Sequence, residues 1–163
     1  MKTLIVYYSL TGNVDFAART LSERIGADLL RLEVQKDYPD KGIKKFLFGG
    51  KSAVMGEKPP LKPYSFAAGD YERIVFCSPI WAGTFAPPLR TFIGENASAL
   101  SGKRFAALLC CSGGGSKKAF ERLRGELGAD HFDAFATLID PKDKPEPVKD
   151  SILWQFADEL TGE

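Results

Sequence analysis

The sequence predicts an α/β protein: one doubly wound domain, residues 1–163, with helices on both faces of a parallel sheet. Short apolar runs rich in β-branched and aromatic residues alternate with segments in which apolar residues recur at the helical period. Parallel neighbouring strands require crossover connections, and the intervening helices supply them. The length of 163 residues and the hydrophobic fraction of 44% suit one domain with a substantial core and exclude disorder.

Five apolar runs are the expected strands. The first run is continuous and β-rich, and polar and glycine residues end it, as is typical of a strand buried on both faces. The same pattern recurs along the chain. The expected strands span residues 2–8, 28–34, 73–77, 105–111 and 132–138.

Helices are expected between these strands. After the turn at 9–13, apolar residues recur on one helix face from Val14 to Ile25, and Gly26 is placed to end that helix. Stripes of the same period follow the third and fourth strands, and Pro147 introduces a last one. The residues of these later stripes are Leu89, Phe92, Ile93 and Asn96; Phe120, Leu123 and Leu127; and Ile152, Phe156 and Leu160.

The segment 35–71 interrupts the alternation. It is longer than one crossover needs, contains several prolines, and carries the pattern of a short helix at 42–48. Connections of this length tend to be functional excursions or mobile loops.

Composition excludes several classes of protein. The 22 basic and 21 acidic residues give a formal charge of +1, which argues against a nucleic-acid-binding surface. The longest apolar run, 105–111, is far shorter than the ~20 residues that span a bilayer. Met1 and Lys2 lead into a β-rich run and not into a secretory signal. We therefore expect a cytoplasmic protein without membrane insertion.

The cysteines and the histidine do not form the pattern of a disulfide framework or a metal site. Cys77, Cys110 and Cys111 are odd in number, end apolar runs and show no CxxC spacing. Their apolar settings favour inert, buried thiols. His131 lacks partners at ligand spacing, so no metal is expected.

The loops that follow the strands are the candidate binding site, because ligands of open parallel sheets bind at the carboxyl ends of the strands. The first loop, Ser9 to Val14, reads SLTGNV and contains no lysine or arginine. Hydroxyls of Ser9 and Thr11, the close approach that Gly12 allows, and the helix start would suit a phosphate. A plain turn with a helix N-cap is an equally good interpretation of this loop alone. Walker A and GxGxxG patterns are absent.

Two further loops are unusual. SPIWAGTFAPP follows the third strand and places Trp81 among small residues, where an indole could stack on an aromatic ring or pack at the rim of the core. Prolines stiffen this loop. CCSGGGSKKAF places three glycines between Ser112 and Ser116, either as a donor-lined edge or as a flexible connection capped by Ser116. Together the three loops indicate a pocket for a flat heterocycle that carries a phosphate.

These motifs resemble those of the flavodoxins and related flavodoxin-like FMN-binding proteins. SLTGNV is similar to the family's S/T-x-T-G-N-T phosphate loop, and SPIWAGTFAPPLRTFI resembles the isoalloxazine loop of a non-classical bacterial branch. Agreement in strand count and loop position covers nearly the whole chain. The resemblance implies a five-stranded parallel sheet in the order 2-1-3-4-5 and FMN as the cofactor.

The resemblance also implies roles for single residues. The first loop would bind the FMN phosphate through the side chains of Ser9, Thr11 and Asn13 and through neighbouring amides. Trp81 would stack on the isoalloxazine ring, which the backbone of 79–85 would line, and the glycine loop would approach the pyrimidine edge. The implied cofactor-binding residues are Ser9, Leu10, Thr11, Gly12, Asn13, Val14, Pro79, Ile80, Trp81, Ala82, Gly83, Thr84, Phe85, Ser112, Gly113 and Gly114.

Several features depart from the family pattern. Val14 replaces the usual final threonine, so we expect phosphate binding to be weaker by about 0.5–1.5 kcal/mol. The chain is not strongly acidic, so electrostatic docking to a basic redox partner is less expected than for typical family shuttles. The three loops contain no carboxylate, which predicts a reduction potential less negative than in acidic relatives. The face of the flavin ring that Trp81 does not cover would be covered by Phe85, by the segment 35–71 or by solvent.

Three functions remain open on the sequence. The leading one is an FMN protein that passes electrons, one or two at a time, between redox partner proteins. The second is a reductase that passes hydride from NADH or NADPH through FMN to a quinone, azo or nitro compound. Phe46, Phe48 and Met55 could wall the second ring that a reductase needs, or could pack across the sheet edge. The third is a flavodoxin-like binding module without a cofactor.

Overall fold

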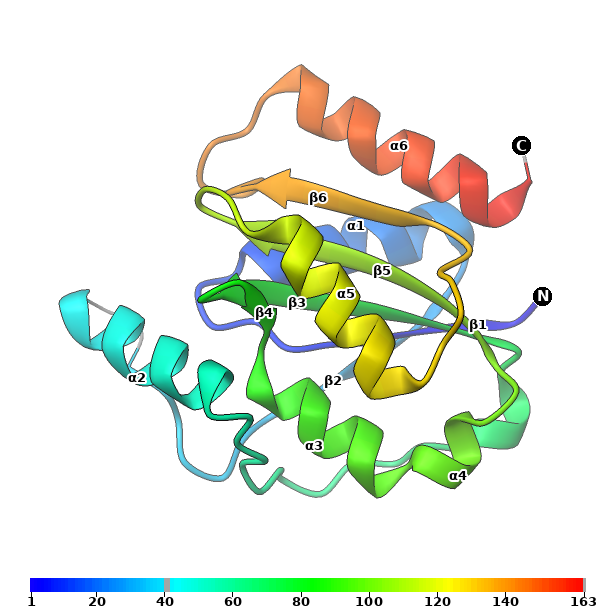
Figure 1. Cartoon of the computed structure of the whole chain (residues 1–163). Helices are drawn as coiled ribbons and strands as arrows, with labels where there is room; N and C mark the ends of the chain where they lie inside the picture. Colours follow the sequence, from blue (N-terminus) through cyan, green and yellow to red (C-terminus); the bar gives the residue numbers. More distant parts are fainter. Residues whose placement is uncertain (40–41, 163) are drawn as a thin grey trace.

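In the part of the chain that the computed structural model describes, residues 1–39 and 42–162 without the side chains of 42–47, six strands form one sheet. Neighbouring strands in the main path are parallel, and the short β4 pairs antiparallel with β3 alone. In spatial order the main path is β2 (Asp28–Arg31), β1 (Thr3–Tyr7), β3 (Arg73–Trp81), β5 (Arg104–Cys111) and β6 (Phe135–Ile139), with β4 (Thr84–Phe85) beside β3 (Figure 1). This order confirms the expected 2-1-3-4-5 arrangement, because β5 and β6 are the fourth and fifth strands of the parallel path.

The helices cover both faces of the sheet. They are α1 (Asn13–Ile25), α2 (Gly42–Val54), α3 (Pro87–Glu95), α4 (Ala97–Leu100), α5 (Ser116–Leu127), α6 (Pro147–Thr161) and the 3-10 helix η1 (Ala68–Asp70). Figure 1 shows α1 and α6 on one face and α3, α4 and α5 on the other. The helical stripes expected from the sequence therefore mark the core-facing sides of real helices. Gly26 ends α1 with a φ of 65°, the left-handed conformation expected of a C-cap.

The core lies in two layers, one on each side of the sheet. Along β3, Ile74 and Phe76 belong to the layer under α3 and α5, whereas Val75 and Cys77 belong to the layer under α1 and α6. All four side chains are fully buried. Because both faces are covered, successive residues of a central strand must all be apolar, and this is why these strands appear as continuous apolar runs.

The two outer strands of the parallel path differ from the expected bounds. β2 ends at Arg31, because beyond the hydrogen bond from the Leu32 N–H to the Tyr7 carbonyl (2.8 Å) the chain turns away, and Val34 pairs antiparallel with Leu61. β6 begins at Phe135 and not at 132. Asp133 lies just before β6, and its carboxylate pairs with Arg73 of β3 and with Arg104 of β5, the strand beside β6.

The segment 35–71 contains a longer helix than the sequence predicts. α2 spans Gly42–Val54 and projects beyond the carboxyl ends of the strands (Figure 1, cyan). Phe48 is 56% exposed and Met55 is 69% exposed, so neither wall residue proposed from the sequence packs on the sheet edge. Phe46 lies outside the described side chains.

Two further features of the described residues concern membranes and metals. None of their helices is long and apolar enough to cross a membrane, and none of their groups of His, Cys, Asp and Glu side chains is arranged to hold a metal ion. Cys77, Cys110 and Cys111 are free and buried, and burial raises the pKa of all three thiols.

Candidate cofactor-binding site

A cavity of about 290 Å³ opens at the carboxyl ends of the central strands. Loops after β1, β3, β5 and β6 line it, together with α2. It lies where connections leave the sheet in opposite directions, the usual ligand position in an open α/β sheet. The lining residues are Ser9, Leu10, Thr11, Asn13, Val14, Gly50, Pro79, Ile80, Trp81, Ala82, Cys110, Cys111, Ser112 and Asp140.

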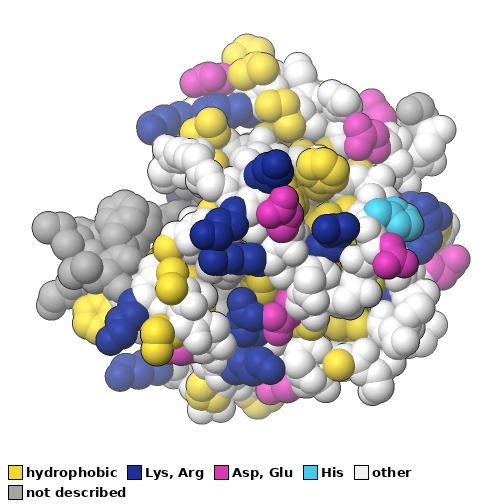
Figure 2. Space-filling view, in the orientation of Figure 1, with side chains coloured by type: hydrophobic (Ala, Val, Ile, Leu, Met, Phe, Trp, Pro, Cys, Tyr) yellow, Lys and Arg dark blue, Asp and Glu magenta, His cyan; other side chains and the backbone are white. Residues whose placement is uncertain are grey.

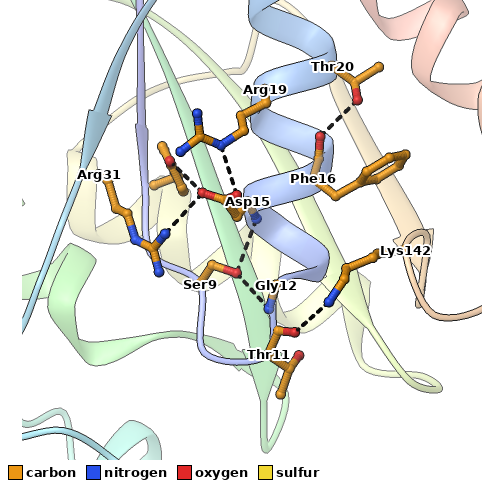
Figure 3. Close-up of polar contacts among 10 residues, drawn as sticks. Ser9, Thr11, Gly12, Asp15, Phe16, Arg19, Thr20, Arg31 and Lys142 are labelled. Atoms are coloured by element: carbon orange, nitrogen blue, oxygen red, sulfur yellow. Dashed lines mark hydrogen bonds and ion pairs between the residues drawn. The ribbon is translucent and has the colours of Figure 1, made fainter.

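Ser9 shapes the first loop through its hydroxyl group. Its Oγ accepts hydrogen bonds from the N–H groups of Gly12 (3.2 Å) and Asp15 (3.1 Å), as Figure 3 shows. Gly12 has a φ of 98°, a conformation that L side chains rarely adopt, and it is the N-cap of α1. The Ser9 hydroxyl therefore holds the turn closed, and its own hydrogen is left to donate.

The turn leaves backbone donors free at the start of α1. The first internal hydrogen bond of the helix runs from the Phe16 N–H to the Gly12 carbonyl (3.0 Å). Among the described residues, the N–H groups of Asn13 and Val14 have no hydrogen-bond partner. These amides, the positive end of the helix dipole and the exposed Thr11 hydroxyl together suit a bound anion.

Asn13 uses its side chain differently from the expected phosphate contact. Its Oδ1 accepts hydrogen bonds from the N–H groups of Lys142 (2.9 Å) and Asp143 (3.3 Å), and its Nδ2 donates to Oδ2 of Asp143 (2.8 Å). The residue is 8% exposed. The Asn13 side chain therefore ties the first loop to the connection between β6 and α6, and little of its hydrogen-bonding capacity remains for a ligand.

Asp15 joins α1 to the sheet beneath this loop (Figure 3). Its carboxylate accepts hydrogen bonds from the Tyr7 hydroxyl (2.7 Å), Arg19 Nε (2.9 Å) and Arg31 Nη1 (3.2 Å). Burial by itself would raise the pKa of Asp15, but the hydrogen bonds from Arg19 and Tyr7 and the two positive charges hold it below its ordinary value. Burial, followed by the bond to Asp15, raises the pKa of Tyr7 to about 12. The charge of Asp15 is thus paired inside the scaffold and does not face the cavity.

The second loop is a tight hairpin. β3 extends beyond Cys77 to Trp81, which is longer than the apolar pattern predicts, and pairs with β4. Ala82 and Gly83 form the turn with φ values of 50° and 71°. Positive φ at both central residues is the requirement of the type I′ turn, one of the two-residue hairpin turns whose twist matches that of the strands. Ala82 faces the cavity in this constrained conformation, so its backbone position is sharply defined.

Trp81 forms a wall of the cavity and is held by an aromatic cluster. Its ring packs edge to face on Tyr8 (centroids 5.8 Å apart) and Tyr38 (5.1 Å). Gly49 of α2 lies so close that a Cβ there would be 3.2 Å from indole Cε3. The Tyr38 hydroxyl and Ser52 Oγ are 3.0 Å apart, which attaches α2 to the same cluster. The segment 35–71 therefore supports the indole, a role that its sequence pattern does not indicate.

Asp140 brings a carboxylate into the cavity from a fourth loop. It directly follows β6, and its Oδ1 accepts a hydrogen bond from Ser112 Oγ (3.0 Å). Its Oδ2 lies 3.1 Å from Lys144 Nζ. The expectation that no carboxylate is near the ligand considered three loops alone. The rule that ligands lie at strand carboxyl ends applies equally to this fourth loop and would have indicated Asp140.

The remaining expected site residues lie outside the cavity lining. Thr84 and Phe85 are each 1% exposed and face the interior, where the Arg90 guanidinium lies 4.7 Å from the Phe85 ring centroid. Phe85 therefore does not cover a ring bound in the cavity. A Cβ at Gly115 would lie 3.3 Å from Gly83 Cα, so close glycine packing joins the second loop to the third. Gly12, Gly83, Gly113 and Gly114 do not line the cavity either.

Comparison with known proteins places the fold. No family model matches the chain. Among solved structures, a flavoprotein in complex with FMN from Lactobacillus acidophilus NCFM matches with a TM-score of 0.75 and 19% identity, over 96% of this chain and 98% of that chain. Flavodoxin 1 from Bacillus cereus matches with a TM-score of 0.58 and 15% identity, over 100% of this chain and 99% of that chain. Two-electron reduced Megasphaera elsdenii flavodoxin matches with a TM-score of 0.61 and 13% identity, over 99% of each chain. These likenesses concern the fold, and the chain has a flavodoxin-like fold.

Proposed function

We propose that this protein binds FMN in the cavity and transfers electrons between redox partner proteins. The main support is the convergence of two unlike features in one cavity: free amides at the start of α1 and the indole wall of Trp81. FMN carries a phosphate at one end and a flat aromatic ring system at the other, which these features match. A structural neighbour of this chain is a flavoprotein in complex with FMN.

The chemistry of the lining residues fits this group. Leu10, Val14, Ile80 and Trp81 supply apolar surface, and Ser112 supplies a hydroxyl that is hydrogen-bonded to Asp140. When bound, FMN supplies the redox chemistry, while the protein contributes position and electrostatics. The chain's own part is to hold the phosphate at the turn, orient the ring against the indole and limit its contact with water.

We place an electron carrier ahead of a reductase, because two of the three residues considered as a wall for a second ring lie outside the cavity lining. Phe48 and Met55 do not line the cavity. On the face in view in Figure 2, basic side chains lie among acidic and hydrophobic ones. A surface of mixed charge does not strongly attract a basic partner, so it suits a redox partner whose docking surface is not strongly basic.

Flavin binding tests the proposal directly. We expect the apoprotein to bind FMN and quench its fluorescence, with a visible spectrum shifted from that of free FMN. The loaded protein should exchange electrons with artificial one-electron donors and show no steady oxidation of NADH or NADPH. Sustained turnover with either nucleotide would support the reductase instead. A folded protein that ignores excess FMN would exclude both flavin functions and favour the cofactor-free module.

Asp140→Asn is expected to raise the midpoint potential of bound FMN. Reduction adds negative charge to the flavin, and a carboxylate in the cavity disfavours that charge. Lys144 offsets part of the effect, so the expected rise in midpoint potential is about 20–50 mV. This corresponds to a change of roughly tenfold or less in the equilibrium constant of a one-electron reduction. Potentiometric titration measures it. Glu146→Gln removes a carboxylate from the same connection outside the cavity lining and should leave the potential nearly unchanged, and equal shifts in both variants would contradict the role of Asp140.

A further inference from the structure

The connection between β6 and α6 brings a lysine to the first loop. Lys142 Nζ lies 3.5 Å from the Thr11 carbonyl oxygen, as Figure 3 shows. A Cβ at Gly12 would lie 3.0 Å from the same Nζ and 3.4 Å from the Lys142 Cδ, so the missing side chain at Gly12 makes room for the lysine. The loop SLTGNV contains no cationic residue of its own. The tertiary structure supplies one.

The position of Lys142 is set by Asn13. The Asn13 Oδ1 accepts hydrogen bonds from the N–H groups of Lys142 and Asp143. These two bonds hold the β6–α6 connection against the start of α1. Asn13 is buried, so these bonds are shielded from water. The lysine side chain then runs from a held backbone to the Thr11 carbonyl and the space beside Gly12, next to the start of α1. Asn13 is a positioning residue in this arrangement.

From this geometry we infer that Lys142 is a specificity-determining residue of the proposed FMN site. Its ammonium group pairs with the phosphate and favours FMN over riboflavin. This inference rests on the proposed function. The distance of 3.5 Å between Lys142 Nζ and the Thr11 carbonyl oxygen makes this contact a weak hydrogen bond. An ammonium group has three N–H donors, so the other two can donate to a ligand. A charge-assisted contact with phosphate would compensate for the hydroxyl that Val14 lacks.

Nearby acidic groups make the lysine more important. The Asp143 carboxylate, held by Asn13 Nδ2 at 2.8 Å, disfavours a phosphate at the adjacent turn. Asp140 is already paired with Lys144. Lys142 thus offsets Asp143, and without it the connection would oppose phosphate binding.

Neutralising Lys142 tests the inference. Wild type, Lys142→Gln and Lys2→Gln would be titrated with FMN and with riboflavin at low and high ionic strength, with fluorescence quenching as the readout. Lys142→Gln should weaken FMN binding about tenfold, change riboflavin binding by less than about twofold and flatten the salt dependence for FMN. Lys2 pairs with Asp28 at the opposite, amino-terminal edge of the sheet. Lys2→Gln removes the same charge and should change neither affinity.

A second variant keeps the inference testable if Lys142→Gln folds poorly. Asp143→Asn retains an oxygen that can accept the Asn13 hydrogen bond and removes the negative charge, so FMN binding should tighten about twofold to fivefold, with riboflavin unaffected. Equal changes for both flavins would overturn the inference and leave Lys142 as a structural latch. Tight FMN binding that Lys142→Gln does not alter would overturn it while the proposed function stands. Failure of the wild type to bind FMN would remove the proposed function itself.

Discussion

Replacing Trp81 with alanine is expected to weaken FMN binding by about 1–3 kcal/mol, or roughly 5- to 150-fold in Kd. The indole is a wall of the cavity, and Tyr8, Tyr38 and Gly49 hold it in one orientation. A flat ring that stacks there gains contact area without first ordering a mobile side chain. The alanine variant loses both the area and the prepared orientation.

Two further substitutions separate stacking from folding. Trp81→Phe retains an aromatic ring and should keep most of the affinity. Trp154→Ala removes the other tryptophan, which is 39% exposed on α6 beside Arg24, and should leave FMN binding unchanged. Flavin titration gives the affinities, and circular dichroism gives the Tm of each variant. A folded Trp81→Ala protein with wild-type affinity would remove Trp81 from the site.

Arg73→Met is expected to lower the free energy of unfolding by about 3 kcal/mol. The Arg73 and Asp133 side chains are 6% and 7% exposed, and Arg73 Nε lies 2.9 Å from the carboxylate. Arg73 Nη1 also donates to the Leu160 carbonyl at 2.7 Å, which fixes the end of α6. Methionine keeps much of the packing volume but leaves buried acceptors without this donor. Unfolding in urea, followed by circular dichroism, measures the change.

Arg104→Met is the matched control for this prediction. Arg104 Nε lies 2.8 Å from the same Asp133 carboxylate, yet its side chain is 54% exposed, so its loss should cost less than about 1 kcal/mol. Similar losses in the two variants would show that burial does not decide the strength of this cluster. Arg73 begins β3, at the end opposite the cavity. Folded Arg73→Met should therefore bind FMN like the wild type, which separates scaffold from site.

The fold follows from patterns within short stretches of sequence. Apolar runs such as 105–111 predict strands covered on both faces, and the apolar stripe ending at Ile25 before Gly26 predicts the bounds of α1 closely. The ends of the strands are predicted less accurately. β3 continues to Trp81 because β4 folds back to pair with it, and β2 stops early because Val34 pairs with distant Leu61. Those pairings depend on partners that a local pattern does not contain.

The candidate site divides in the same way. The turn from Ser9 and the position of Trp81 after a buried strand are contiguous motifs, so the sequence alone was sufficient to indicate a phosphate loop and an aromatic wall. Packing between segments far apart in the chain decided the rest. It turned Asn13 toward the β6–α6 connection, set Lys142 at a loop without a cation and placed Asp140 in the cavity. Periodicity records which face of an element is buried, whereas the charges that meet at a site depend on how the strand ends and connections come together in three dimensions.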